Sequence, residues 1–492
     1  MSLGQLIELM DRWRRAKVLV VGDLMLDRYA YGNADRLSPD APVPVLAVER
    51  EHHAPGGAAN VALDLLALRC DVAIAGVIGG DSAGSILKHA LDDAGCDTAA
   101  LAVDRDRPTT VKHNLIGLAQ HRHPQKMFRM DVESRQPLPD SVRADLIGRA
   151  IAAVSAVDAV VLEDYGKGVL GHDVCRAVID AARQAGTPVY VDPAAVSDYA
   201  KYAGATCITP NRTEAYLAAG PQHAGASPEQ VGRWLLEEVG FDRVVLTLDR
   251  SGALLLARDE PVQAIPTRAR EVYDVTGAGD MVVAALCAAR CNDAPWSQAV
   301  ELANLAAGLE VERPGVTPIP FDELLAALLD ESRGERGKVR TIVELLPELS
   351  AHRSAGRKIV FTNGCFDLLH AGHVQYLRAA KRQGHKLVVG LNTDDSIRRL
   401  KGEGRPVNHL DDRLLVLSEL ESIDYLLPFD QDTPLELIRK IRPDVLVKGA
   451  DYTLDTVVGR DVVEANGGRV ELIDLVQGRS TTGLIDRMRA LA

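Results

Sequence analysis

The sequence predicts an α/β protein with two domains, each built on a parallel sheet covered by helices. Three observations lead to this fold class. Short β-branched runs alternate with helix-length stretches along all 492 residues, the strand runs are almost wholly apolar, and the pattern restarts after a charged, glycine-broken stretch. Near-continuous apolar strands are typical of parallel sheets buried on both faces, whereas one-sided antiparallel strands alternate between apolar and polar residues.

The first half of the chain contains the apolar runs of one sheet. Strands are expected at 18–21, 72–77, 159–162, 189–191, 207–209 and 244–248. In such sheets, ligands gather beyond the carboxyl ends of the strands. The polar residues that fall at these ends are Asp23, Asp81, Asp164, Asp192 and Asn211.

A second βα series begins after residues 330–338, DESRGERGK, which show no apolar periodicity and have the composition of a linker. A helix over 341–353 leads into strands at 358–362, 387–391, 425–427, 445–447 and 470–473. We therefore expect a first domain over 1–330, a linker over 331–340 and a second domain over 341–492.

Charge and composition exclude several classes of partner. Lys and Arg total 56 against 69 for Asp and Glu, and this formal charge of −13 argues against a nucleic-acid binder. No apolar run is long enough to cross a bilayer, and the first 17 residues suggest a short polar helix rather than a signal peptide. The seven cysteines are scattered without a CxxC pair, as expected of reduced, buried thiols. We expect a cytoplasmic protein with no membrane partner.

The first chemical motif is Gly277-Ala278-Gly279-Asp280, followed by an apolar helix. Small residues allow a ligand to approach the backbone, and a helix start directs free N–H groups and the positive end of the dipole toward a transferring phosphate. A carboxylate at Asp280 is able to take the proton of an attacking hydroxyl. The alternative is a glycine turn in which Asp280 only caps the helix.

Further motifs accompany this turn, and together they resemble the ribokinase-like sugar kinase family over residues 15–320. The resemblance implies that Asp280 is the general base and that the amides of residues 277–279 form the anion hole. It places Asp27, Gly56, Gly57 and Asn60 at the sugar, and Asn211, Arg212, Thr213 and Glu214 near Mg²⁺ and the ATP phosphates, with Glu214 as the metal ligand. It also places Asn304 at the adenine. Lys112 and Arg129 are candidates for a substrate phosphate, with solvated surface charge as the alternative.

The second chemical motif is His370-Ala371-Gly372-His373, which follows an expected strand and opens a helix. Two imidazoles three residues apart project from one side of a first helical turn, where helix amides also favour a polyphosphate. A zinc site would need a third ligand at a suitable spacing, and the sequence offers none. The other alternative is a pair of solvated or capping histidines.

This HxGH segment resembles the nucleotidyltransferases related to cytidylyltransferases and pantetheine-phosphate adenylyltransferase, a Rossmann-like fold. The resemblance adds a cationic loop ending at Lys401 and a second phosphate-binding helix start at Ser480, Thr481 and Thr482. A phosphate monoester acceptor is already an anion and needs no general base. Charge neutralisation by His370, His373 and Lys401 therefore suits nucleotidyl transfer, whereas the carboxylate of the first site suits a hydroxyl nucleophile.

The whole chain, with the domains in this order, resembles the bacterial family of bifunctional D-glycero-β-D-manno-heptose 7-phosphate kinases and heptose 1-phosphate adenylyltransferases. The resemblance implies phosphorylation at C1 with ATP and Mg²⁺, and later AMP transfer that gives ADP-heptose for lipopolysaccharide core. A separate phosphatase would act between the two steps. We also expect a homodimer in which residues 39–48 form a lid strand that pairs between subunits.

Two alternatives remain open from the sequence. One is the same pair of reactions on another sugar phosphate, or cytidylyl rather than adenylyl transfer, because sequence does not settle how the base is read. The other is a non-catalytic nucleotide-binding protein. The intact Asp280, Gly277, His370, His373 and Lys401 argue against that second alternative.

Overall fold

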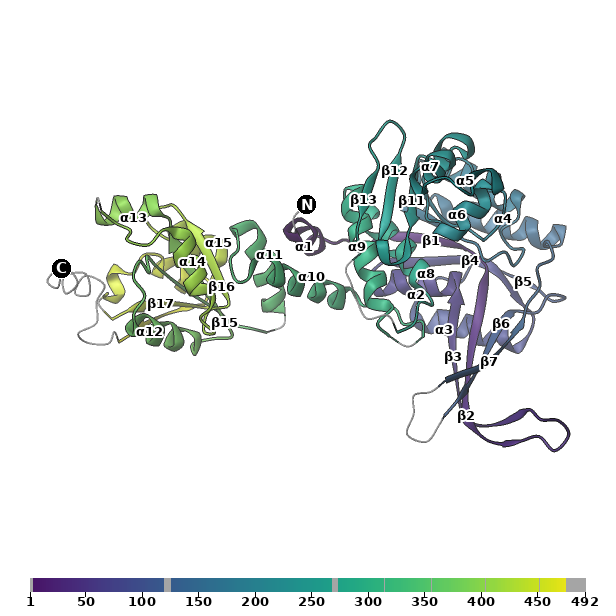
Figure 1. Cartoon of the computed structure of the whole chain (residues 1–492), viewed down its shortest axis with the longest axis horizontal. Coiled ribbons are helices and arrows are strands. Elements are labelled where there is room, and N and C mark those ends of the chain that lie inside the picture. Colours follow the sequence, from purple (N-terminus) through teal and green to yellow (C-terminus); the bar gives the residue numbers. More distant parts are fainter. Residues whose placement is uncertain are drawn as a thin grey trace. The chain divides into compact units, whose positions relative to one another are not determined.

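A computed structural model describes residues 3–118, 125–267, 273–313, 315–354, 356–402, 404–450 and 452–474 (Figure 1). The chain forms two compact units. One consists of Trp13–Leu324, and the other combines Leu325–Ala492 with Met1–Arg12. Each unit is an α/β fold, so the predicted fold class is confirmed.

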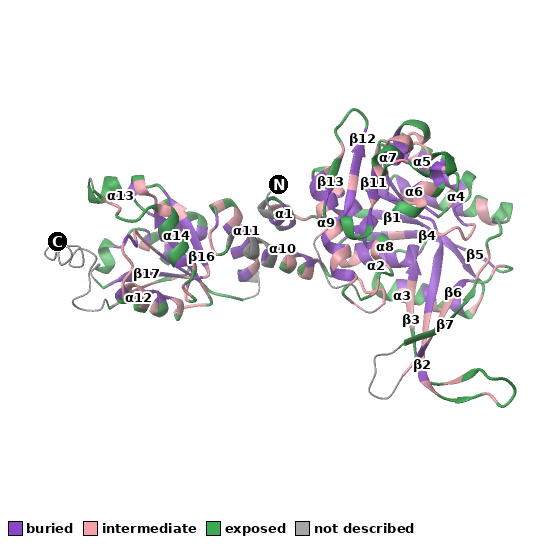
Figure 2. Ribbon diagram, in the orientation of Figure 1, coloured by how far each residue is buried: buried purple, intermediate pink, exposed green. Residues whose placement is uncertain are grey.

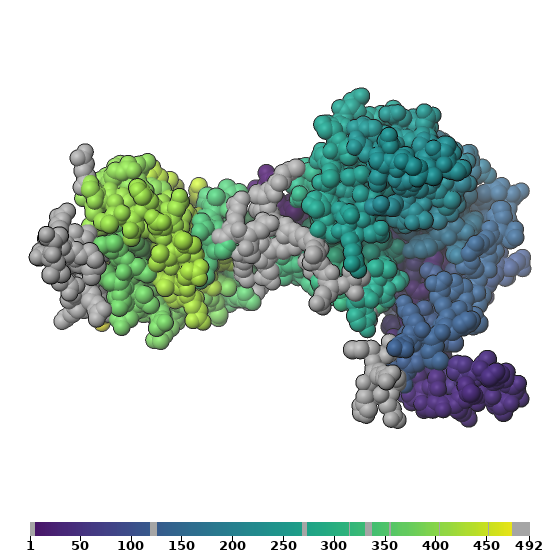
Figure 3. Space-filling model, viewed as in Figure 1, coloured from purple at the N-terminus to yellow at the C-terminus, as the bar shows by residue number. Residues whose placement is uncertain are grey.

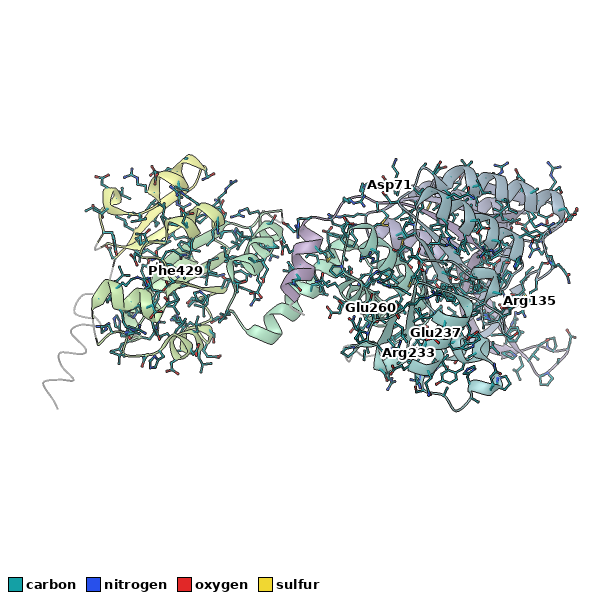
Figure 4. The ribbon with its side chains drawn as sticks, turned by 90° about the horizontal axis from the view of Figure 1, so that it is seen from above. Asp71, Arg135, Arg233, Glu237, Glu260 and Phe429 are labelled. Atoms are coloured by element: carbon teal, nitrogen blue, oxygen red, sulfur yellow. The ribbon has the colours of Figure 1, made fainter. Side chains whose placement is uncertain are left out.

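The N-terminal unit is centred on a nine-stranded sheet of order β13-β12-β11-β10-β9-β8-β1-β4-β5. Its strands are β1 (Lys17–Gly22), β4 (Asp71–Gly79), β5 (Leu101–Asp104), β8 (Ala159–Glu163), β9 (Val189–Asp192), β10 (Cys207–Ile208), β11 (Arg243–Thr247), β12 (Ala253–Ala257) and β13 (Gln263–Ile265). All six predicted strands are present, and they run parallel. The antiparallel edge strands β12 and β13 were not expected. Asp71, labelled in Figure 4, opens β4.

Helices pack against this sheet and bury its apolar strands, which are coloured purple in Figure 2. Helices α4 and α5 pack on each other in one layer, and α2, α8 and α9 pack together in another. The helices of the unit are α2 (Ala58–Ala67), α3 (Ser82–Ala94), α4 (Asp140–Val154), α5 (His172–Ala185), α6 (Arg212–Ala219), α7 (Pro228–Trp234), α8 (Ala278–Cys291) and α9 (Trp296–Glu310).

A smaller four-stranded sheet of order β3-β2-β6-β7 was also not predicted as a sheet. Its strands are β2 (Leu24–Leu37), β3 (Pro44–Gly57), β6 (Thr110–Gly117) and β7 (Gln125–Val132). Of the lid strand expected over residues 39–48, only the part from Pro44 is extended, and it pairs with β2 of the same chain. The outer half of the β2–β3 hairpin forms the purple lobe in Figure 3. Its residues are mostly exposed, so the apolar run that marks a buried strand is missing.

The C-terminal unit has a five-stranded parallel sheet of order β16-β15-β14-β17-β18. Its strands are β14 (Ile359–Gly364), β15 (Lys386–Asn392), β16 (Tyr425–Phe429), β17 (Val445–Gly449) and β18 (Arg469–Ile473). Phe429, labelled in Figure 4, ends β16. All five predicted strands are present. The strand order reverses between β14 and β17, and such a switch point is where open α/β sheets bind ligands.

The helices of the C-terminal unit connect these parallel strands or lead into the sheet. They are α11 (Ile342–Ser354), α12 (Ala371–Lys381), α13 (Asp394–Lys401), α14 (Leu410–Ser418), α15 (Leu435–Ile441) and α16 (Arg460–Ala465).

The segment predicted as an irregular linker, 331–340, is mostly helical. Helix α10 extends over Phe321–Arg336, because glutamate and arginine favour helix and Gly334 costs only about 1 kcal/mol within it. Beyond the helix, Val339 pairs with Leu426 of β16, and Arg340 is buried against Glu348. Low apolar periodicity was therefore a misleading sign of irregular backbone.

The first helix, α1 (Leu3–Asp11), also differs from the polar helix expected at the N-terminus. Leu6, Ile7 and Met10 are buried, and α1 packs against α11 of the C-terminal unit. These three positions lie on one face at helical spacing. The amino end of the chain therefore contributes to the unit that carries its carboxyl end.

The domain limits 1–330 and 341–492 lead to a prediction. We expect fragments 1–333 and 338–492 to keep their separate activities when expressed alone, because no proposed site residue is shared across the cut. Fragment 338–492 lacks α1, so its unfolding midpoint should rise when residues 3–12 are added as a peptide. Separate assays and thermal unfolding test both points. A folded but inactive fragment that regains activity when its partner is added would contradict the proposed boundary.

Candidate active sites of the two units

The turn before α8 places glycine where the backbone requires it. Gly277 is the N-cap of α8 with φ of 92°, a left-handed conformation that other residues adopt only with strain. A Cβ at Gly277 would also lie 2.6 Å from Oε1 of Glu310. Ala278 and Gly279 begin the helix, so their amides lie among the first-turn N–H groups that have no partner within a helix. The structure thus places these three small residues at a helix start, and phosphate binding by their amides remains a prediction.

Asp280 lies in the first turn of α8 and is buried. The hydroxyl of Tyr165 donates to its Oδ1 at 2.7 Å, and Nδ2 of Asn60 donates to its Oδ2 at 2.9 Å. Burial raises the pKa of Asp280 above the usual Asp value, and these two hydrogen bonds lower it in part. The carboxylate is therefore held in one orientation and has a greater proton affinity than an exposed aspartate.

Tyr165 is a site residue that the sequence analysis missed. It follows β8 in a loop anchored by the buried carboxylate of Asp23, which accepts backbone N–H groups of Tyr165 at 2.9 Å, Lys167 at 2.9 Å and Val169 at 3.2 Å. Burial raises the pKa of Asp23 to about 6, with a further contribution from Asp164. The only sequence signal was the position of Asp23 at a strand end, and no motif marked Tyr165.

The predicted sugar-binding residues lie on the small sheet and the start of α2. Asp27 of β2 is buried, and its Oδ1 has no hydrogen-bond partner among the described residues. A Cβ at Gly56 would lie 2.7 Å from Oδ2 of Asp27, so only glycine leaves this carboxylate accessible there. Gly57 precedes α2, on which Asn60 is directed at Asp280. The structure therefore brings Asp27, Gly56 and Asn60 into one region.

The two predicted phosphate ligands differ in their surroundings. Lys112 of β6 pairs in register with Asp27, and its ammonium lies 5.0 Å from the ring centroid of Tyr165. Its positive charge opposes the rise in the pKa of Asp27 that burial causes. Arg129 of β7 is instead held by Asp131 in two contacts of 2.9 Å and is more than half exposed. Lys112 is the better placed of the two.

Residues 211–214 form the cap of α6 in this structure. The backbone N–H of Asn211 donates to Oε2 of Glu214 at 2.8 Å, and the backbone N–H of Glu214 donates to Oδ1 of Asn211 at 3.0 Å. Arg212 and Thr213 lie in the first turn of the same helix. This reciprocal capping box accounts for the NxxE spacing structurally, and a metal role for Glu214 remains a prediction.

A second group of carboxylates lies closer to Asp280. Glu163 and Asp192 are the last residues of β8 and β9 and pair in register. One oxygen from each of Glu163, Asp192 and Asp280 lies within 4.8 Å of the others. Burial raises the pKa of Asp192 well above its usual value, and the charge of Glu214 raises it further, so Glu214 borders this group. Glu163 was not predicted, since a single acid at a strand end carries no motif.

Asn304, the predicted adenine contact, lies on α9. Its Nδ2 donates to the backbone carbonyl of Ile265 at 3.2 Å, which connects α9 to β13. This bond uses one of its two amide hydrogens. Contact with adenine therefore remains a prediction.

In the C-terminal unit, His370 and His373 meet at the start of α12. His370 is the N-cap residue, and the ring centroids of the two histidines are 3.9 Å apart with the rings stacked. Burial lowers the pKa of His373 to about 4, and the positive charges of His370 and Lys401 lower it further. His373 is therefore neutral at pH 7, so it does not carry the expected positive charge, and its contact with phosphate remains a prediction.

Lys401 is the last residue of α13 and lies within electrostatic range of His373. The segment 398–402 is thus the end of a helix and not the loop that the sequence suggested. Arg398 and Arg399 of the same turn are ion-paired with Asp395 and Asp432. Of the cations in this turn, the exposed ammonium of Lys401 is the group whose positive charge lowers the pKa of His373.

Other charged residues shape the surroundings of these histidines. Asp367 is buried and accepts from Nε of Arg405 at 2.6 Å and from the backbone N–H of Val407 at 2.7 Å. Arg413, 2% exposed, donates to the backbone carbonyls of Cys365 and Asn392, both at 2.8 Å. These contacts connect the loop after β14 to the end of β15. No motif indicated Arg413.

Lys448 is a further cation near the switch point. It lies in β17, and its ammonium donates to Oδ1 of Asn363 in the neighbouring strand β14. The run Lys448-Gly449-Ala450 at a strand end was the signal that could have identified it. The predicted phosphate-binding residues Ser480, Thr481 and Thr482 lie outside the described residues.

Comparisons with known proteins now identify both units. The pfkB family of carbohydrate kinases matches residues 15–322, and the cytidylyltransferase-like family matches residues 361–477. The bifunctional protein HldE of Trichlorobacter lovleyi is 46% identical over 481 residues, covering 98% of this chain and 97% of that protein. HldE of Geobacter sulfurreducens is 45% identical over 472 residues, covering 96% and 95%. The chain belongs to the HldE family.

Membership of the HldE family confirms the predicted pair of activities. The chain is a bifunctional enzyme in which a heptose kinase precedes an adenylyltransferase, and these two activities imply the use of ATP. Within the part of the chain that the structure describes, no helix is long and apolar enough to cross a membrane.

Solved structures show the fold of the N-terminal unit. Escherichia coli phosphofructokinase-2 in complex with substrates and products matches with a TM-score of 0.52 at 17% identity, covering 65% of this chain and all of that one. A putative ribokinase from Agrobacterium tumefaciens matches with a TM-score of 0.51 at 19% identity, covering 65% and 99%. At these identities the likeness concerns the fold alone.

Proposed function

We propose that Asp280 is the general base of the HldE-type kinase reaction. As the C1 hydroxyl oxygen of heptose 7-phosphate attacks the γ-phosphorus of ATP, its proton passes to Asp280 and the bond between the γ-phosphorus and the bridging oxygen breaks, releasing ADP. The amides of Gly277, Ala278 and Gly279 stabilise the charge on the transferring group. The main support is the buried carboxylate of Asp280 at a helix start, with one oxygen held by Tyr165 and the other by Asn60.

Binding of the sugar phosphate is assigned to the neighbouring polar groups. Asp27 accepts hydrogen bonds from sugar hydroxyls, and Lys112 supplies positive charge beside it. Arg129 extends this positive region if substrate displaces Asp131. These assignments rest on the shared location of Asp27 and Lys112.

The magnesium site is proposed on Asp192 and Glu214, with Glu163 behind them. The residues fit the ion, because hard cations prefer carboxylate oxygens, and the oxygens of Glu163 and Asp192 already lie within 4.8 Å of each other. A magnesium ion held by Asp192 and Glu214 would supply positive charge to neutralise the phosphates of ATP. Asp280 stays outside the ligand set in this assignment, since its two oxygens are engaged by Tyr165 and Asn60.

In the second site, a phosphate oxygen of heptose 1-phosphate attacks the α-phosphorus of ATP, and the bond to the departing pyrophosphate breaks. His370 and His373 donate hydrogen bonds to the phosphates, while Lys401 and Lys448 supply positive charge. Ser480, Thr481 and Thr482 are proposed to hold the phosphates from a second helix start. The stacked histidines at the N-terminus of α12 are the observation that supports this assignment.

The order of the reactions requires a third enzyme. The kinase product carries phosphates at C1 and C7, whereas the second reaction uses the 1-phosphate, so a separate phosphatase removes the 7-phosphate. A coupled assay tests this order. We expect ATP and heptose 7-phosphate to give the bisphosphate alone, and ADP-heptose with pyrophosphate to form only when the phosphatase is added. ADP-heptose without the phosphatase would contradict it.

We further propose a cytoplasmic homodimer. All seven cysteines are free thiols, as a reducing compartment would keep them. The small sheet exposes large apolar side chains, with Leu37 63%, Val48 50% and Phe128 65% exposed, and such patches mark protein interfaces. Sedimentation should therefore give two copies, and Phe128→Glu should shift the protein toward one.

A further inference from the structure

A buried pair of acids lies behind the kinase base and has no assigned role. Asp64, on α2, is fully buried, and its Oδ1 has no hydrogen-bond partner among the described residues. Glu310, the last residue of α9, is also fully buried, and neither of its oxygens has a side-chain partner in the described part of the chain. A buried carboxyl oxygen without a hydrogen-bond partner costs free energy, and such costs are typical of functional sites.

The two acids interact with each other and with Asp280. Burial raises the pKa of Asp64 well above its usual value, and the charges of Glu310 and Asp280 raise it further. Burial raises the pKa of Glu310 to about 8, with a contribution from Asp280. At pH 7 Glu310 is therefore mostly protonated, which removes one negative charge from this buried group.

Asn60 connects Asp64 to the base. Asn60 and Asp64 are four residues apart on α2 and so lie on one face of that helix. Nδ2 of Asn60 donates to Oδ2 of Asp64 at 3.2 Å and to Oδ2 of Asp280 at 2.9 Å. A side-chain amide has two donor hydrogens, so both hydrogens of Asn60 are used by these two acids.

This arrangement determines which way the amide of Asn60 faces. If the amide were flipped, its carbonyl oxygen would face two carboxyl oxygens, and the hydrogen bond to Asp280 would be lost. Two acceptors on the same side make the observed orientation much more favourable than one acceptor would. The carbonyl of Asn60 is consequently turned away from both acids, and Asp280 keeps its second hydrogen bond.

We propose that Asp64 is a positioning residue of the kinase site, which acts through Asn60 to hold Asp280 in its reactive orientation. This inference rests on the role proposed above for Asp280. With Tyr165 on one oxygen and Asn60 on the other, rotation of the Asp280 carboxylate is restricted before substrate arrives. Loss of the acceptor at position 64 allows the amide of Asn60 to rotate. The Asp280 carboxylate then loses one of the two hydrogen bonds that restrict its own rotation.

The test compares variants of the full-length enzyme. Asp64→Leu removes the acceptor while keeping a side chain branched at Cγ, and it should lower kinase kcat by about 10- to 100-fold, the range that misplacement of a reacting group produces. The KM for the sugar phosphate should rise, whereas the KM for ATP should stay the same. Asp64→Asn keeps an acceptor oxygen and should retain most of the turnover. Asp64→Ala replaces the leucine variant if that variant does not fold.

Leu65→Val is the matched control, because it alters packing of the same helix without removing a partner of Asn60. It should change the thermal unfolding midpoint and leave kcat unchanged. The inference is overturned if Asp64→Leu keeps wild-type kcat, or if Asp64→Asn and Asp64→Leu lose activity equally. Asp280→Asn, measured alongside, separates the two hypotheses. If Asp280→Asn is inactive while Asp64→Leu is fully active, only the positioning role of Asp64 is refuted. If Asp280→Asn is fully active, the proposed role of Asp280 as the base is refuted.

Discussion

Asp280→Asn is expected to eliminate heptose phosphorylation and leave AMP transfer unchanged. An amide is nearly isosteric with the carboxylate but does not accept the hydroxyl proton, and general-base contributions are on the order of 10²–10⁴-fold. The structure adds a second reason. The single oxygen of an amide accepts from Tyr165 or from Asn60, so one of the two donors that hold Asp280 would lose its partner. Initial rates of both reactions on one preparation measure the effect.

AMP transfer by the same chain is the internal control for this variant. Because the residues proposed for that reaction, His370 and His373, lie in the other unit, its rate reports whether the protein concentration is correct and the C-terminal unit is intact. The unfolding midpoint of the N-terminal unit checks that the change has not disrupted it. Near-normal phosphorylation by the variant would show that another group removes the proton.

His373→Ala is expected to remove AMP transfer without affecting the kinase. Loss of one preorganised donor to developing charge costs on the order of 10²-fold or more. The side chain also stacks on His370 at 3.9 Å between centroids, so its removal frees the neighbouring ring. Rates of pyrophosphate release and of ADP release, measured separately, distinguish the two activities.

His385→Ala is a suitable matched control, because His385 precedes β15 at the amino end of the sheet, opposite the edge that carries the HxGH motif. It should keep AMP transfer close to the wild-type rate. Burial lowers the pKa of His373 to about 4, so its protonated fraction is already small at pH 5.5 and falls further as pH rises. Wild-type and His385→Ala enzymes should therefore show no loss of AMP transfer between pH 6 and 7 from titration of this group. Equal loss of both reactions in His373→Ala would indicate misfolding instead.

The buried strands were predictable because they are coded locally. Runs such as 18–21 and 387–391 are apolar throughout, and burial on both faces of a parallel sheet leaves little choice of residue. The outer parts of β2 and β3 contain no such apolar run, because these strands are largely exposed beyond their inner ends. The helical character of residues 331–336 was missed for a related reason, because charged helix formers carry no apolar period.

Short sequence motifs located the candidate site residues. They did not show which other residues surround them in the fold. The amides of residues 277–279 and the pair His370 and His373 each belong to one turn, so short spacing suffices to identify them. Tyr165 depends on Asp23, which lies 142 residues earlier and holds its backbone N–H. Such a contact exists only because β1 and β8 are neighbours in the sheet.

What the sequence determined alone is the two-unit α/β plan, the two chemistries and the residues within each motif, because periodicity and short spacing are properties of neighbouring residues. The tertiary structure decided which groups control those residues. Asn60 and Asp280 are 220 positions apart, yet packing of α2 against α8 brings them to 2.9 Å, and Glu163 joins Asp192 because β8 pairs with β9. Proton affinity follows the same rule: burial, which no local pattern encodes, makes Asp280 a better base and keeps His373 neutral.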